Sequence, residues 1–392
     1  MIAPASIPVT GAEAICNVKL LKVLSENGYK IDLISKKMKY THYPETDLAE
    51  LGLSLNSVSI IEVDNKMSLK VIWQHLCCLF IFGTVFKGAH WAYCALKTAK
   101  KLCKENQYDA IITKNSPSEL LGSYFKKKKG YKWIATWNDP YPTKKYPKPY
   151  GNGVTAKLFI LESPLLNLME KADYHIFPNQ RIRDYMRSYL NIPSEKTRII
   201  PHVVIPREHH DTPHENLRIV HLGNLLPPRD ATPFLRALTE FIKNEKDAKL
   251  EIAFIGQTPQ SVKDFVNTTH LEKYVKVFPP VKYKESQQIL ESYDIQLIVE
   301  APCEEGIFLP TKVSDSMQLG KPIFTISPSV GVLNDLYKQG HISYFSSVQN
   351  EKNILSTLRQ IYKDFTNGKI KSFSLEKSYS PRTIFQQYNE II

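Results

Sequence analysis

Apolar residues along the chain fall into short runs, separated by longer stretches in which they recur every three or four positions. The short runs of the first half are rich in β-branched and aromatic residues, as buried strands are. They are KIDLIS (30–35), SVSIIEV (57–63), YDAIITK (108–114), YKWIAT (131–136) and DYHIFP (173–178). Strands that alternate with helices in this way predict a parallel, doubly wound sheet.

The first helix is predicted from its spacing and from its end. Ile15, Val18, Leu21 and Leu24 recur at three-residue steps, which gives a helix over about 12–27 an apolar face. Gly28 follows directly, at the position where many helices end in a left-handed residue. We therefore expect this helix to end at Gly28.

A second set of strands follows the polar stretch HVVIPREHHDTPHEN (202–216). Its runs are LRIVHLG (217–223), AKLEIAFIG (248–256), YVKVF (274–278), DIQLIVE (294–300), KPIFTIS (321–327) and ISYFS (342–346). No fixed-period repeat is present, so we expect a second parallel sheet rather than a solenoid. The expected layout is a Rossmann-like N-terminal domain over 1–202, a linker over 203–216 and a Rossmann-like C-terminal domain over 217–379. A last helix over 380–392 is expected to pack back on the first domain.

Composition supports this two-domain layout. A chain of 392 residues with 43% hydrophobic residues can bury two cores of ordinary size. The six cysteines show no paired metal-ligand spacing, so we expect reduced and mostly buried thiols in a cytosolic protein. Four linker histidines fit no strand or helix face, and a polar linker explains them better than a metal site does. They are His202, His209, His210 and His214.

One segment raises the question of a membrane. VIWQHLCCLFIFGTVF (71–86) is the most apolar run, but it is shorter than the roughly 20 residues that span a bilayer, and it contains Gln74 and His75. A buried helix and a membrane-surface helix both remain open. The first residues contain no export signal. We expect a cytoplasmic protein, with a peripheral position on the inner face of the cell membrane left open.

The net charge of +12 is unevenly distributed. Residues 1–200 contain 29 Lys and Arg against 17 Asp and Glu, whereas residues 201–392 contain 22 of each. Lysine runs at 126–129 and 144–148 would attract an anionic membrane surface or an anionic acceptor, although either run alone reads as a solvated face. Because the runs lack the interleaved aromatic residues of a stacking platform, we do not expect a nucleic-acid partner.

Ligands of open parallel sheets bind beyond the carboxyl ends of the strands, and four loops there carry candidate residues. In IPVTGAEA (7–14), Gly11 would let a ligand approach the backbone, and Glu13 begins a helix. In TWNDPYP (136–142), Asp139 and the aromatic residues suit a sugar or acceptor pocket. A tight turn in the first loop and a self-capping Asp139 in the second are the alternatives.

The other two loops belong to the second half. HLGNLLPPRD (221–230) places Arg229 at the head of a helix, either as a phosphate ligand or paired with Asp230. In the segment at 304–325, Pro310 is followed by Thr311 and Lys312, which predicts a second helix N-terminus with a cation. Asp315 lies one turn into that helix, where a carboxylate can receive the vicinal hydroxyls of a ribose.

These motifs together resemble glycosyltransferase family 4, the retaining, nucleotide-sugar-dependent enzymes of the GT-B fold. The two most telling are GNLLPPRDATPFLRAL (223–238) and GIFLPTKVSDSMQLGKPIF (306–324). Four further segments match segments of the family in the same order along the chain: GAEAICNVKLLKVLSENGYKIDLIS, YDAIITKNSP, KWIATWNDPY and TRIIPHVV. The resemblance implies two Rossmann-like, doubly wound parallel-sheet domains that face a cleft.

The resemblance also implies roles for individual residues. Arg229 and Lys312 would bind the donor diphosphate as catalytic residues, and Asp139 would join them from the acceptor side. Donor-binding positions are Gly11, Gly223, Asn224, Arg229, Glu305, Pro310, Thr311, Lys312 and Asp315. Acceptor-side positions are Glu13, Asn138 and Asp139. No cofactor or metal is expected, because the two cations replace a divalent ion.

Three positions depart from the family pattern. Asn224 stands where the family has the first of two basic residues. Ile307 lies eight residues before Asp315, at the position of the family's first glutamate, so that Glu305 supplies a carboxylate only if the loop shifts by two residues. Asn138 stands where many members have a histidine. These departures affect the sugar contacts more than the nucleotide site.

The sequence thus predicts a hexosyltransferase that moves a sugar from a UDP- or GDP-sugar to a hydroxyl of a glycan or lipid-linked acceptor in cell-surface polysaccharide synthesis. A nucleotide-sugar epimerase of the same fold is one alternative, and it would need acid–base groups that we do not find. A non-catalytic sugar- or nucleotide-binding protein derived from a transferase is another, favoured by the changes at Asn224 and Ile307.

Overall fold

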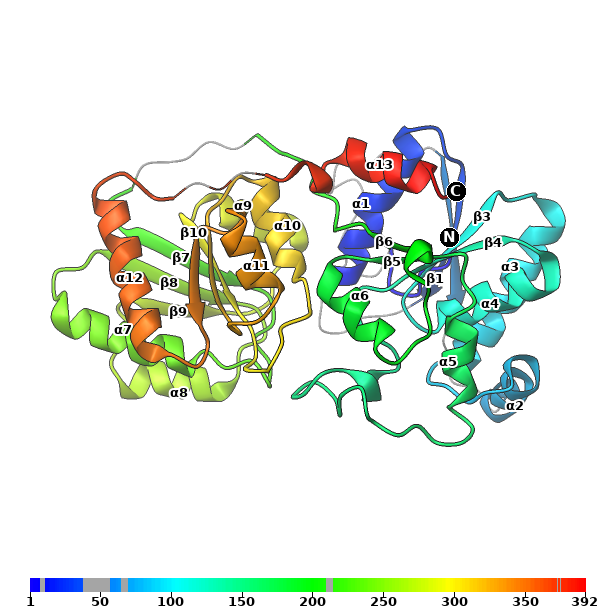
Figure 1. Cartoon of the computed structure of the whole chain (residues 1–392). Helices are drawn as coiled ribbons and strands as arrows, with labels where there is room; N and C mark the ends of the chain where they lie inside the picture. Colours follow the sequence, from blue (N-terminus) through cyan, green and yellow to red (C-terminus); the bar gives the residue numbers. More distant parts are fainter. Residues whose placement is uncertain (8–10, 38–56, 65–69, 209–213, 372, 374) are drawn as a thin grey trace. The chain divides into compact units, whose positions relative to one another are not determined.

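The computed structural model describes residues 1–7, 11–37, 57–64, 70–208, 214–371, 373 and 375–392 (Figure 1). The chain divides into two compact units. Unit 1 comprises Met1–Tyr146, Gly151–Val203 and Ser378–Ile392, and unit 2 comprises Pro147–Tyr150 and Val204–Lys377. That residues 1–202 and 217–379 fold as separate domains stays a prediction.

Unit 1 is built on parallel strands. A pair, β1 (Ile31–Lys37) and β2 (Val58–Asp64), lies beside a four-stranded sheet of order β3-β4-β5-β6. The four strands are β3 (Ala110–Lys114), β4 (Lys132–Thr136), β5 (Tyr174–Phe177) and β6 (Thr197–Ile199). Ile2 makes parallel bridges to Ile34 of β1 and to Thr113 of β3, and so joins the two groups of strands.

Helices of unit 1 alternate with these strands. They are α1 (Ala12–Glu26), α2 (Val71–Phe82), α3 (Ala89–Glu105), α4 (Ser118–Lys129), α5 (Pro164–Met169), α6 (Gln180–Arg187) and α13 (Pro381–Asn389). The helix predicted over 12–27 is confirmed, and Gly28 follows its last turn with φ +95°. The last helix returns to the start of the chain, where Tyr29 Oη donates to Asn389 Oδ1 at 2.9 Å.

Close backbone packing in unit 1 depends on one glycine. A Cβ at Gly122 of α4 would lie 2.1 Å from Nε1 of the fully buried Trp133. The Trp133 indole in turn donates to Thr113 Oγ1 at 2.8 Å. Only glycine therefore lets α4 lie this close to the β3–β4 surface.

Unit 2 has the strand order of a Rossmann fold. Its strands are β7 (Leu217–Leu222), β8 (Leu250–Ile255), β9 (Val275–Phe278), β10 (Ile295–Val299), β11 (Ile323–Ser327) and β12 (Tyr344–Ser347). They form one parallel sheet in the order β12-β11-β10-β7-β8-β9. The order reverses between β7 and β10, and this switch point is where such sheets bind ligands.

The strands of unit 2 are connected by α7 (Thr232–Asn244), α8 (Gln260–Thr268), α9 (Tyr283–Glu291), α10 (Thr311–Gln318) and α11 (Val332–Lys338), and α12 (Glu351–Thr366) follows β12 (Figure 1). Phe234, Phe254 and Phe324 are buried in one core between the sheet and α7 and α12. The strands predicted from the apolar runs are present in both units. The three-residue β6 was not predicted, because its sequence TRI shows no apolar run.

Candidate functional site

The site in unit 2 is built at the switch point between β7 and β10. Gly223 follows β7 with φ +97°, a conformation that favours glycine. A Cβ there would lie 3.1 Å from Cε of Lys312, so the glycine also leaves room for that side chain. Gly223 thus brings the end of β7 against the first turn of α10.

Lys312 extends from the second position of α10, which begins at Thr311, directly after Pro310, as the sequence predicted. Its Nζ lies 3.3 Å from Nε2 of the fully buried His221. Burial, with the charge of Arg229 next, lowers the pKa of Lys312 to about 8. The ammonium is therefore held in a place that disfavours its charge as long as no anion is bound.

His221 accepts the hydrogen bond of Lys312 because of what lies on its other side. Its Nδ1 is 3.1 Å from the carbonyl oxygen of Leu297, which can only accept, so Nδ1 holds the proton. Burial, followed by the charge of Lys312, lowers the imidazole pKa well below its usual value. The ring is thus neutral and presents the Nε2 lone pair to the ammonium.

Arg229 lies beside this pair in an ion pair with Glu300. Its Nε and Nη2 donate to the two Glu300 carboxylate oxygens at 3.2 Å and 3.4 Å. Glu300 directly follows β10 and is 10% exposed, and it also accepts from Tyr150 Oη at 3.0 Å. Burial and the charge of Glu300 raise the pKa of the Tyr150 phenol.

The placement of Arg229 differs in one detail from the sequence analysis. The helix begins at Thr232, so Arg229 lies in the turn before it rather than in its first turn. Asp230 accepts from the backbone N and from Oγ1 of Thr232, at 2.8 Å and 2.6 Å. Asp230 therefore hydrogen-bonds to the first residue of α7, whereas the Arg229 side chain extends to Glu300 at the end of β10.

The remaining predicted donor residues lie around the same strand ends. Asp315 of α10 accepts from Tyr283 Oη at 2.7 Å, and Asn224 Oδ1 accepts from the backbone N of Gln257 at 3.2 Å. Glu305 lies in the loop after β10 and is partly exposed. Ile307 is fully buried, so the position that the family pattern gives to a carboxylate belongs to the core.

A pocket adjoins the Arg229–Glu300 pair. Its lining includes Tyr150, Glu300, Cys303, Phe308 and Gly331. The Tyr150 and Phe308 rings meet edge to face, with centroids 5.1 Å apart. The pocket therefore places aromatic surface beside the Glu300 carboxylate at the end of β10.

The predicted acceptor-side residues gather in unit 1. Asn138 Nδ2 donates to Glu13 Oε2 at 2.6 Å, which joins the start of α1 to the loop after β4. Burial raises the pKa of Glu119 to about 8, and the charge of Glu13 adds to this effect. Burial and the charge of Asp139 raise the pKa of Tyr146.

Gly11 occupies the N-cap position of α1, at φ +151°, and among the described residues no atom lies within 4 Å of a Cβ built there. The conformation favours glycine at this position. Of the predicted site residues, Gly11, Glu13, Asn138 and Asp139 belong to unit 1. Unit 2 contains the predicted donor residues Gly223, Asn224, Arg229, Glu305, Pro310, Thr311, Lys312 and Asp315.

Three further residues were missed. Glu300 had a usable signal, because an acidic residue directly after an apolar strand points to the carboxyl end of the sheet. His221 lies inside a strand, and Tyr150 lies 54 residues before Val204, where the rest of unit 2 begins, so neither carries a local signal.

No group of three or more His, Cys, Asp or Glu side chains is arranged for a metal ion in the described residues. His209 and His210 lie outside those residues. His214 contacts Asp294 at 3.0 Å, and His202 is buried.

Comparison with known proteins identifies the chain. Residues 17–208 match the model of the family described as Glycosyltransferase Family 4. None of the curated proteins compared with the sequence matches it. Among solved structures, Anabaena HepE in complex with UDP-glucose has a TM-score of 0.68 at 12% identity, covering 99% of this chain and 98% of that chain.

Two further structures are similar over nearly their full lengths. Sucrose-phosphate synthase of Thermosynechococcus elongatus has a TM-score of 0.67 at 13% identity, over 100% of this chain and 97% of that chain. The apo form of the lipopolysaccharide outer core galactosyltransferase WaaB has a TM-score of 0.59 at 14% identity, over 100% and 97%. At these identities the likeness shows the fold, which is GT-B. The match over residues 17–208 shows that this part of the chain, 192 of its 392 residues, belongs to glycosyltransferase family 4.

Proposed function

We propose that the protein transfers a hexose from a UDP- or GDP-sugar to a hydroxyl of a glycan or lipid-linked acceptor, in cell-surface polysaccharide synthesis at the inner face of the cell membrane. The observation that carries this proposal is the pair of cations Lys312 and Arg229 at the switch point of unit 2. The groups around these two cations favour the binding of a diphosphate.

Lys312 is the stronger half of the argument. A buried ammonium whose acceptor is a neutral imidazole is poorly compensated, as its pKa of about 8 indicates. A diphosphate at the N-terminus of α10 would supply the missing negative charge and would also accept from backbone N–H groups. Binding of an anion there would offset the cost of removing the Lys312 ammonium from water.

Arg229 and the helix N-terminus suit the departure of the nucleotide. Charge that develops on the leaving diphosphate is stabilised by each charge-assisted hydrogen bond, at about 1.5–3 kcal/mol each. We therefore propose that no divalent metal is needed and that Arg229 and Lys312 act as catalytic residues. Family membership implies retention of the anomeric configuration, with the leaving phosphate assisting deprotonation of the acceptor.

Glu13, Asn138 and Asp139 are proposed to serve the acceptor, with Asp139 as the catalytic member. Glu13 and Asn138 are already hydrogen-bonded, and Glu119 lies near enough for its pKa to be raised by Glu13. A cluster of acidic and amide groups can accept and donate to sugar hydroxyls. The solved structure of Anabaena HepE with UDP-glucose supports a nucleotide-sugar donor.

The test measures nucleotide binding and release. Calorimetry with UDP, GDP and ADP should give the tightest binding for one diphosphate, weakened by on the order of 2 kcal/mol in Arg229→Ala. Arg236→Ala is the matched control, because Arg236 of α7 also pairs with a glutamate, Glu351, at 3.1 Å, but its side chain is 60% exposed. Equal binding by wild type and a folded Arg229→Ala would overturn the donor site.

Turnover distinguishes the alternatives. Release of free nucleotide that requires an acceptor, and that persists in a chelator, supports the transferase. Binding without release indicates a non-catalytic protein, and conversion of the donor sugar without an acceptor indicates an epimerase. NMR of the product's anomeric proton tests retention.

A further inference from the structure

Helix α2 turns large apolar side chains toward solvent. Ile72, Trp73, Leu76 and Phe80 are 75%, 63%, 43% and 84% exposed. They recur at three- and four-residue steps and so lie along one face of the helix. A surface helix of a globular protein normally points its polar face outward, and α2 does the opposite.

The inward face of α2 fixes this orientation. Gln74 Nε2 lies 3.6 Å from Cys94 Sγ of α3, and Cys78 Sγ lies 3.2 Å from the carbonyl oxygen of Ala89. Phe82 is buried, with its ring 5.8 Å from that of Phe86. Gln74, Cys78 and Phe82 therefore form the face of α2 that packs on the protein. This packing fixes the orientation of the helix and leaves its apolar stripe exposed.

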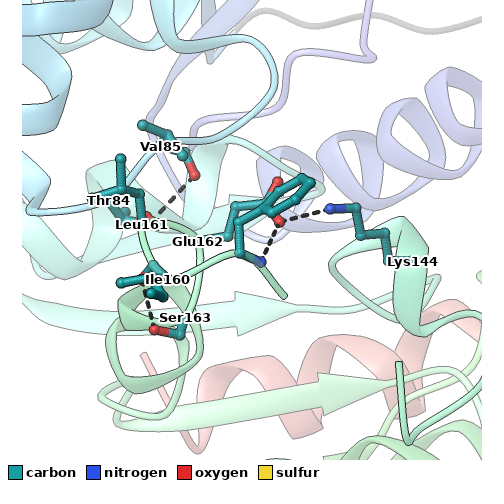
Figure 2. Close-up of polar contacts among 8 residues, drawn as sticks. Thr84, Val85, Lys144, Ile160, Leu161, Glu162 and Ser163 are labelled. Carbon is teal, nitrogen blue, oxygen red and sulfur yellow. Dashed lines mark hydrogen bonds and ion pairs between the residues drawn. The ribbon is translucent and has the colours of Figure 1, made fainter. Parts of the chain in front are cut away.

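A second apolar protrusion comes from a turn before α5. Phe159 and Ile160 are 69% and 89% exposed. The turn is held by hydrogen bonds from Glu162 N to Phe159 O at 2.8 Å and from Ser163 Oγ to Ile160 O at 2.8 Å. Lys144 also holds the turn, because its Nζ lies 2.8 Å from the Glu162 carboxylate (Figure 2). The same Nζ lies 3.9 Å from the centre of the Phe159 ring.

The two protrusions are joined. Leu161 O accepts from Val85 N and from Thr84 Oγ1, both at 2.9 Å (Figure 2). The turn is thereby fixed to the chain that leaves α2. We call the combined surface the apolar patch, and its exposed members are Ile72, Trp73, Leu76, Phe80, Ile81, Val85, Phe159, Ile160 and Leu161.

Charge around the apolar patch is predominantly positive, and the adjoining Glu162 is paired with Lys144. The sequence contains no Asp or Glu over 65–104 or over 140–161, the two stretches that supply the patch. Lys70, Lys87 and Lys157 are exposed at its ends. An anionic lipid surface complements this arrangement, whereas a symmetric pairing of two copies would bring the same lysines together.

We propose that the apolar patch inserts into the interface of an anionic lipid bilayer and anchors unit 1 there. The proposal rests on the proposed function only in that a lipid-linked acceptor gives the contact its purpose. No helix in the described part of the chain could itself cross a bilayer, so the contact is with the surface. The lysine run at 126–129 is not part of this surface, because it forms the last turn of α4, where Lys126 pairs with Asp173.

The chain contains its own reporter. Trp73 is 63% exposed, whereas Trp91, Trp133 and Trp137 are at most 1% exposed. Binding to vesicles of equal parts phosphatidylcholine and phosphatidylglycerol should therefore shift the tryptophan emission to the blue and protect it from iodide. Lipids brominated near the headgroup should quench it. Trp73→Phe should lose all three signals while it still binds.

Variants test the surface itself. Phe80→Ser with Ile160→Ser should weaken co-sedimentation with these vesicles at least about tenfold, because each replacement removes a large apolar side chain that the lipid interface would bury. Phe278→Ser is the matched control, since Phe278 is a 43% exposed aromatic residue of unit 2. Equal binding by the double variant and wild type, or no binding to anionic vesicles, would overturn the proposal.

Oligomerisation is the competing outcome. If Trp73 is protected from iodide without lipid, and sedimentation gives a dimer that the double variant abolishes, a second copy covers the patch and the membrane assignment is wrong. Nucleotide binding by unit 2 is measured without vesicles. A failure of membrane binding therefore leaves the donor site untouched, and a failure of the donor site leaves membrane binding untouched.

Discussion

Lys312 Nζ lies 3.3 Å from Nε2 of the buried His221, and the Lys312 side chain is half-buried. Because the imidazole is kept neutral, the acceptor of the ammonium is a dipole, and the charges of Glu300 and Asp315 only partly offset the lowering of the Lys312 pKa. This relationship makes the site sensitive to pH near neutrality, which a surface lysine would not be.

Nucleotide affinity should fall as pH rises through about 8, the pKa of Lys312. Below that pH the free protein already holds the ammonium that the diphosphate needs, whereas above it binding must first take up a proton. Calorimetry of UDP binding between about pH 7 and about pH 9.5 should show this decline, with proton uptake above pH 8. Lys312→Met should bind weakly with a flat profile. A wild-type affinity that does not change over the range would contradict the assignment.

Gly223→Ala should destabilise the fold and weaken nucleotide binding. Gly223 has φ +97°, and its Cβ would lie 3.1 Å from Lys312. Gly28→Ala is a matched control, since Gly28 has φ +95° with no atom within 4 Å of a Cβ. Both variants should lose on the order of 1 kcal/mol of unfolding free energy in urea from the backbone conformation. Only Gly223→Ala should lose nucleotide affinity, and equal affinities would show that the contact with Lys312 is unimportant.

Asp315 should be required as a carboxylate. If it receives the ribose hydroxyls, activity should fall in the order Asp, Glu, Ala, because Glu keeps the acceptor atoms at a shifted position. Tyr283→Phe provides an intermediate case, since it removes the donor 2.7 Å from Asp315 but leaves the charge. The measurement is kcat and KM for donor turnover. Similar values in all four proteins would return Asp315 to an ordinary position on the helix surface.

Glu119 should make stability depend on pH. Its folded pKa of about 8 lies above the ordinary value of 4.5, so between these values the folded protein binds more protons than the unfolded chain. The free energy of unfolding should therefore fall as pH rises from 4.5 to about 8, by about 1.4 kcal/mol for each unit of pKa difference. Urea unfolding of Glu119→Gln should lack this decline. If the free energy of unfolding fell equally with pH in wild type and in Glu119→Gln, Glu119 would not be the group responsible.

Local pattern was sufficient for the elements and for part of the site. Gly223 marks the end of a strand and Pro310 marks the start of a helix, and the position of Lys312 just after Pro310 identified it as a candidate. The same reasoning overlooked the partner of Arg229. Glu300 lies 71 residues further along, and the two meet only because β10 pairs with β7. Strand order is a property of the whole sheet, which no short motif contains.

The apolar run at 71–86 shows a different limit. Its composition fits a buried helix and a surface helix equally well, since both need large apolar side chains. Packing decided between them: Gln74 and Cys78 face α3, while Phe80 faces solvent. A pattern of apolar residues thus reveals that a face exists but not what covers it.

The chain enters unit 2 twice, first for Pro147–Tyr150 and again from Val204. A gene fragment that encodes only residues 204–377 would therefore omit Tyr150, whose hydroxyl donates to Glu300 at 3.0 Å and whose ring lies 5.6 Å from the Arg229 guanidinium. Modular exchange of the C-terminal half with a relative would have the same defect, because the incoming half would meet a foreign residue at position 150. Such a chimaera therefore needs the four residues Pro147–Tyr150 transplanted together with residues 204–377.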